Sequence, residues 1–160
     1  MKTNENRHYL IFSIVVILIG CSPSEHVNND IQIEMKKHHV NAWLNLMPSM
    51  SPGTFHLTGD ITLKNDSQIK LDSLSLMKII VYADSEEVYI IKPVFKPKSK
   101  DENYSLSSGS NKEFIFETEK GLKIKEKLID YKMIDLKLEF QSHMGKQSFV
   151  INNIKVERAY

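Results

Sequence analysis

The stretch FHLTGDITL, residues 55–63, decides the fold class of this 160-residue chain. Phe55, Leu57, Ile61 and Leu63 alternate with polar side chains. A period of two places one set of side chains on each face of an extended strand, so one face is apolar and the other polar. The same alternation returns at residues 31–36, 113–117, 134–141 and 153–157. We therefore predict half-buried antiparallel strands in all five stretches.

The middle of the chain differs, because two runs there are almost continuously apolar. MKIIVYA (77–83) and VYIIKPVF (88–95) are typical of strands covered on both faces. The polar stretch DSEE (84–87) between them predicts a hairpin. Pro93 predicts the end of strand pairing or a position at a sheet edge. Only KGLKIKEKLIDY (120–131) allows a short helical turn as an alternative to a strand.

Together these stretches predict an all-β fold in one domain. About seven or eight strands with little helix indicate a single antiparallel β-sandwich. TGDITLKN (58–65) resembles the strand ending in Asn of immunoglobulin-like envelope domains. LSSGS (106–110) resembles the Leu-x-x-Gly turn that precedes a central strand in the same domains. The resemblance implies an Ig-like sandwich, although the disulfide and buried Trp spacing of antibody domains are missing from this sequence.

The N-terminus has the features of a secretory signal. Lys2 and Arg7 give it a basic start, and the apolar run YLIFSIVVILI (9–19) follows. This run is shorter than the roughly 20 apolar residues that span a bilayer, and it fits the central region of a signal peptide. It ends at LIGC (18–21), which resembles the lipobox of bacterial lipoproteins. The resemblance implies cleavage after Gly20 and attachment of diacylglycerol and an N-acyl chain to Cys21, the only cysteine of the chain.

This interpretation divides the chain into a signal peptide (1–20), a lipidated N-terminus and tether (21–30), and a β-sandwich domain (31–160). The tether sequence SPSEHVNND is polar, contains Pro, Ser and Asn, and has no apolar periodicity. We expect a location in the bacterial cell envelope, lipid-anchored on the periplasmic or outer-membrane face. The membrane is the first expected partner, and the covalent lipid takes the place of any cofactor.

Charge and motifs limit the possible functions. Removal of residues 1–20 leaves as many acidic as basic residues, so we expect no nucleic-acid partner. The sequence has no Gly-x-Ser-x-Gly nucleophile elbow and no glycine-rich phosphate loop. We therefore expect no catalytic residues and no enzymatic activity. The predicted function is non-catalytic binding or scaffolding, with an envelope protein as partner.

Periplasmic binding of copper or another metal is the alternative function. Imidazole and thioether ligands suit Cu(I), and the chain has six histidines and seven methionines. The candidate ligands are His39, His56 and His143. His38 and His39 are neighbours in a predicted strand and point to opposite faces, so only one of them can join a common site.

Two stretches are candidates for an interaction surface. Lys96 and Lys98 lie in the basic segment KPVFKPKSK (92–100), which suits an acidic partner or anionic lipid headgroups. Trp43 and Met50 belong to the densest apolar cluster of the chain, around the turn PSMSPG (48–53). A solvated connection is the alternative for the lysines, and burial in the core is the alternative for the apolar cluster.

Lipidation predicts the outcome of the substitution Cys21→Ser. Only a thiol forms the thioether to diacylglycerol, so we expect this variant to accumulate as an unprocessed precursor. Ser22→Ala is the matched control and should be processed like the parent chain. Intact-mass spectrometry of the membrane fraction measures both. A Cys21→Ser chain that is still cleaved and still bound to the membrane contradicts the prediction.

Overall fold

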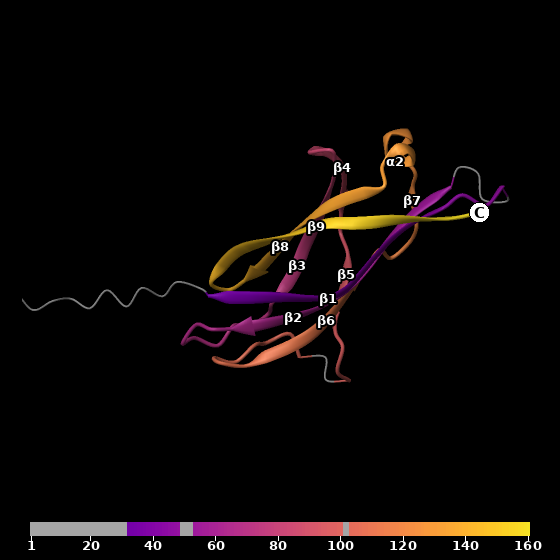
Figure 1. The fold of residues 1–160 in the computed structure, drawn as a ribbon. Coiled ribbons are helices and arrows are strands. Elements are labelled where there is room, and N and C mark those ends of the chain that lie inside the picture. Colours follow the sequence, from indigo (N-terminus) through magenta and orange to yellow (C-terminus); the bar gives the residue numbers. More distant parts are fainter. Residues whose placement is uncertain (1–31, 49–52, 101–102) are drawn as a thin grey trace, which may run out of the picture.

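The computed structural model describes residues 32–48, 53–100 and 103–160 (Figure 1). Strands predominate, and no helix among these residues is long and apolar enough to cross a membrane. The elements are β1 (Ile33–Asn45), β2 (Thr54–Asn65), β3 (Ser75–Ala83), β4 (Glu86–Ile91), β5 (Val94–Pro97), β6 (Asn111–Glu117), β7 (Leu122–Lys123), α2 (Glu126–Asp130), β8 (Met133–Ser142) and β9 (Gly145–Ala159).

The strands form one hydrogen-bonded sheet that curls on itself (Figure 1). Its order is β4-β3-β8-β9-β1-β2-β6-β5, and the short β7 pairs with β2. The all-β prediction is confirmed. The described residues contain nine strands rather than seven or eight, because the segment 120–131 supplies both the two-residue β7 and the short helix α2. The strand and the helical turn expected as alternatives there are both present.

Strand β9 connects the two halves of the sheet. Its first part pairs antiparallel with β8, and its last residues pair with β1 in parallel. The prediction of a purely antiparallel arrangement is therefore wrong at this pair. β8 and β1 lie on opposite edges of β9, so β9 can pair with both strands. β8 reaches along β9 as far as Lys155, and Val156–Ala159 pair with Ala42–Asn45 of β1.

The two halves of the sheet enclose one apolar core. The inward side chains of the stretch that decided the fold class are at most 1% exposed, as their alternation predicted. Phe55 of β2 stacks on Tyr89 of β4, with ring centroids 5.1 Å apart. These two strands lie far apart in the sheet order, so the contact requires the sheet to curl. Lys92 and Pro93 alone separate the two edge strands, β4 and β5, along the chain, which confirms the prediction for Pro93.

The hairpin expected around DSEE is present, with Asp84 and Ser85 as its two-residue turn between paired Ala83 and Glu86. The prediction that both central strands are covered on both faces is wrong. β4 is an edge strand, and Ile90 on it is 60% exposed. A continuous apolar run does not reveal whether a second layer covers it, and here the outer face meets solvent.

Asn65 fixes the end of β2 from a fully buried position. Its Nδ2 donates to the carbonyl oxygens of Ile69 (2.7 Å) and Leu106 (3.0 Å). Its Oδ1 accepts from the Ser67 backbone N–H at 3.1 Å, and its own carbonyl accepts from the Gly109 N–H at 2.8 Å. The Asn at the strand end and the Leu-x-x-Gly turn, two separate motifs in the sequence, are thus in direct contact.

This corner predicts a large effect for Asn65→Ala. The variant removes one donor from each of the carbonyls of Ile69 and Leu106 and also removes the acceptor of the Ser67 N–H, so the free energy of unfolding should fall by about 2–4 kcal/mol. Asn152→Ala is the control, because Asn152 is exposed on β9 and its loss should cost less than about 0.5 kcal/mol. Urea denaturation followed by tryptophan fluorescence measures both variants. Equal stabilities of the two variants contradict the structural role of Asn65.

Candidate functional site

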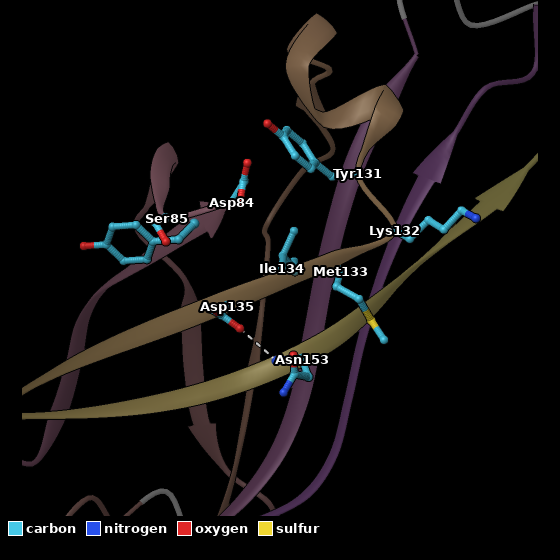
Figure 2. A pocket seen from close by; sticks show the side chains of 9 residues that line it. Asp84, Ser85, Tyr131, Lys132, Met133, Ile134, Asp135 and Asn153 are labelled. Carbon is cyan, nitrogen blue, oxygen red and sulfur yellow. Dashed lines mark hydrogen bonds between the residues drawn. The ribbon is translucent and has the colours of Figure 1, made fainter.

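A pocket of about 410 Å³ opens where the β3–β4 turn, the start of β8 and an irregular point of β9 meet (Figure 2). These three segments are distant in sequence, and the sheet order brings them together. The lining residues are Tyr82, Asp84, Ser85, Tyr131, Lys132, Met133, Ile134, Asp135 and Asn153.

The backbone around this pocket is unusual. Asp84 and Ser85 have φ angles of 49° and 66°, the left-handed conformations that a two-residue hairpin turn requires. Asn153 has φ 60° at the point where the β8–β9 register shifts. These are three of the four non-glycine residues with positive φ in the described part of the chain. The carboxylate Oδ1 of Asp135 accepts a hydrogen bond from the Asn153 N–H at 2.8 Å and so holds the irregular backbone in place (Figure 2).

The side chains that face the pocket are polar and aromatic. In Figure 2 the Tyr131 side chain extends toward Asp84, whereas those of Lys132 and Met133 point away from both. The side chains of Tyr82, Asp84 and Tyr131 form no hydrogen bond or ion pair with another described residue, so the Asp135–Asn153 bond is the one that holds pocket groups together. The site thus offers phenol, carboxylate, hydroxyl and amide groups to a ligand, above the buried side chain of Ile134.

The predicted basic surface at Lys96 and Lys98 differs from this pocket, because neighbouring carboxylates compensate the positive charges of both lysines. Lys96 Nζ lies 3.2 Å from the carboxylate of Glu117. Lys98 Nζ lies 3.1 Å from Asp60 and 3.3 Å from Glu113. The hydrogen bond to Asp60, followed by that to Glu113, raises the pKa of Lys98. Both lysines therefore belong to ion pairs across β5, β6 and β2 rather than to an uncompensated basic patch.

The predicted apolar cluster divides between the two faces of the sheet. Leu44 and Phe55 are fully buried in the core. Trp43 lies on the opposite face, half-buried, and stacks on His56 with ring centroids 5.0 Å apart and an interplanar angle of 8°. Met50 lies outside the described residues, as do Gly20 and Cys21.

The three candidate metal ligands lie at separate places. His39 pairs with Asp60 and His56 with Trp43, so four positions of β2, roughly 13 Å, separate the two imidazoles along the strand. His143 lies in the β8–β9 turn, where its Nδ1 accepts from the Asp72 N–H at 3.2 Å. His56 Nε2 is hydrogen-bonded to Thr54 Oγ1 at 2.9 Å. Residues 32–48, 53–100 and 103–160 contain no group of three His, Cys, Asp or Glu side chains that could hold a metal ion.

No protein-family model matches the chain, and no curated protein matches it.

The pocket residues were not among the candidates from the sequence. The sequence contained one signal for the pocket, the turn predicted at DSEE (84–87). A two-residue turn there places Asp84 and Ser85 in the left-handed backbone conformation. The positions of Tyr131 and Asn153 beside that turn depend on strand order and register, which no local pattern contains.

Because the Asp135 side chain accepts a hydrogen bond from the Asn153 backbone, two substitutions of Asp135 should have different effects. Asp135→Ala removes the acceptor of the Asn153 N–H, so the free energy of unfolding should fall by about 1 kcal/mol. Asp135→Asn keeps an oxygen acceptor and should cost less than half as much. Urea denaturation, together with amide hydrogen exchange of Asn153, measures both. Identical losses for the two variants contradict the role of the acceptor and indicate an effect of charge.

Proposed function

We propose that this protein is a lipid-anchored protein of the bacterial cell envelope that binds a ligand or partner without catalysing a reaction. The lipobox-like sequence LIGC and the polar stretch after it support the anchor. The main support for the binding role is the position of the pocket. It lies at one end of the domain, and β1 starts at the opposite end.

Strand register supports this arrangement. β1 starts at Ile33, opposite Asn65, and its Ala42 pairs with Val156 of β9, close to Asn153 of the pocket. Nine steps along the extended strand lead from Ile33 to Ala42, a distance of roughly 30 Å. In Figure 1 β1 begins at the left beside the β8–β9 turn, whereas the β3–β4 turn and α2 lie at the top. A lipid at Cys21 therefore leaves the pocket end pointing away from the membrane in this proposal.

We further propose that the curled sheet is an Ig-like sandwich. The order β1-β2-β6-β5 corresponds to strands A, B, E and D of that fold, and β4-β3-β8-β9 corresponds to C′, C, F and G. In such sandwiches the loops gather at the two ends of the domain, and binding residues are often placed on them. The pocket at the β3–β4 turn agrees with this use of the fold.

Photo-crosslinking in native membranes tests the binding role. A photoreactive phenylalanine derivative replaces Tyr131, whose ring faces the pocket, in the full-length chain. The control replaces Lys98, which forms ion pairs near the edge strand β5. We expect a discrete crosslinked species from position 131 and none from position 98. Crosslinks from position 98 alone, or from neither position, contradict recognition at the pocket.

A further inference from the structure

We infer that the pocket at the β3–β4 turn binds a saccharide; this inference rests on the binding role proposed above. Its evidence is the kind of groups that face the pocket and the absence of intramolecular partners for several of them among the described residues. The volume of about 410 Å³ falls in the range of about 300–1,000 Å³ that is usual for small-ligand sites.

The hydrogen-bonding groups of the pocket match the hydroxyls of a sugar. The carboxylates of Asp84 and Asp135 accept hydrogen bonds only, whereas the phenols of Tyr82 and Tyr131 both donate and accept. The Asn153 amide supplies both functions as well. Neighbouring hydroxyls of a pyranose ring likewise donate and accept, so each can pair with a carboxylate on one side and a phenol or amide on the other.

The pocket also offers apolar surface suited to the C–H face of a pyranose. Tyr82 and Tyr131 are partly exposed, so their rings can cover a sugar ring while their hydroxyls stay at its edge. Ile134, 2% exposed, is a buried apolar residue of the same lining. A ligand with polar edges and an apolar face is the class that uses both kinds of surface.

A charged ligand forms hydrogen bonds with fewer of these groups than a sugar does. Lys132, the basic residue among the described lining residues, extends away from the pocket in Figure 2, and two carboxylates repel an anion such as phosphate. An ammonium group satisfies the carboxylates, but it has donors only. It therefore makes no use of the donor groups of Tyr82, Tyr131 and Asn153, which stay hydrogen-bonded to water.

The test is a titration of the full-length, ¹⁵N-labelled chain in a sugar-free detergent such as lauryldimethylamine oxide. The probes are trisaccharides of glucose, galactose, mannose and N-acetylglucosamine, each followed by backbone amide shifts. We expect at least one to shift Asp84, Ser85 and Asn153 saturably. Tyr131→Ala and Asp135→Asn should each weaken that binding by about tenfold or more. Asp135→Asn keeps the acceptor for Asn153, so a loss there reports on the ligand.

Lys98→Ala is the matched control and should bind the trisaccharide as the parent chain does. Tetramethylammonium and lysine methyl ester are titrated in parallel. Saturable shifts of the pocket amides by these cations and by no saccharide overturn the inference in favour of a cation site. No pocket shift with any trisaccharide, from a chain with a dispersed native spectrum, also overturns it. A crosslink from position 131 in that case retains the proposed function and rejects only the saccharide.

Discussion

The closed shape of the sheet depends on Tyr89 of the edge strand β4. Its ring stacks on Phe55 of β2, in the other half of the sheet, at an interplanar angle of 1°. Its hydroxyl donates to the carbonyl of Lys123 at 2.9 Å and accepts from the Lys125 N–H at 2.9 Å. Burial raises the pKa of the Tyr89 phenol, so the hydroxyl remains a donor at neutral pH. One side chain thus joins β4 to β2 and to the segment between β7 and α2.

That segment also shapes the pocket. α2 ends at Asp130, and Tyr131 and Lys132 follow it directly into β8. The position of Tyr131 therefore depends on how the segment is fastened to β4. Lys125 strengthens this attachment, because its Nζ donates to the Val88 carbonyl and lies 5.2 Å from the centroid of the Tyr89 ring. The same contacts cover part of the β4 edge with a lysine, a common way to discourage pairing with another chain.

Much of the fold was predictable from the sequence, because alternation is a local property. The inward residues of β2 and β8 and the hairpin at Asp84 follow from patterns a few residues long. The parallel pairing of β1 with β9 does not, because it joins residues more than 110 positions apart in the sequence. The exposure of Ile90 depends likewise on the position of β4 at an edge. Local patterns identify strands but do not give their neighbours.

The site was less predictable for the same reason. Lys96 and Lys98 form a basic run in the sequence, yet the carboxylates that compensate them lie on β6 and β2. Asp84, Tyr131 and Asn153 are unremarkable where they occur in the chain, and only the sheet places them around one pocket.

In the pocket, the groups that fix the backbone differ from the polar groups that face outward, and this difference is the main support for the proposed binding site. Its backbone is held by the hairpin geometry at Asp84 and by the bond from Asn153 to Asp135. Most of the stability of the domain comes from elsewhere, from the core around Phe55 and the buried corner at Asn65. The Tyr131 ring packs against the edge of the core, but its hydroxyl, like the Asp84 carboxylate, has no hydrogen-bond partner among the described residues. Such polar groups, on a backbone held in an uncommon conformation, support the proposed binding role.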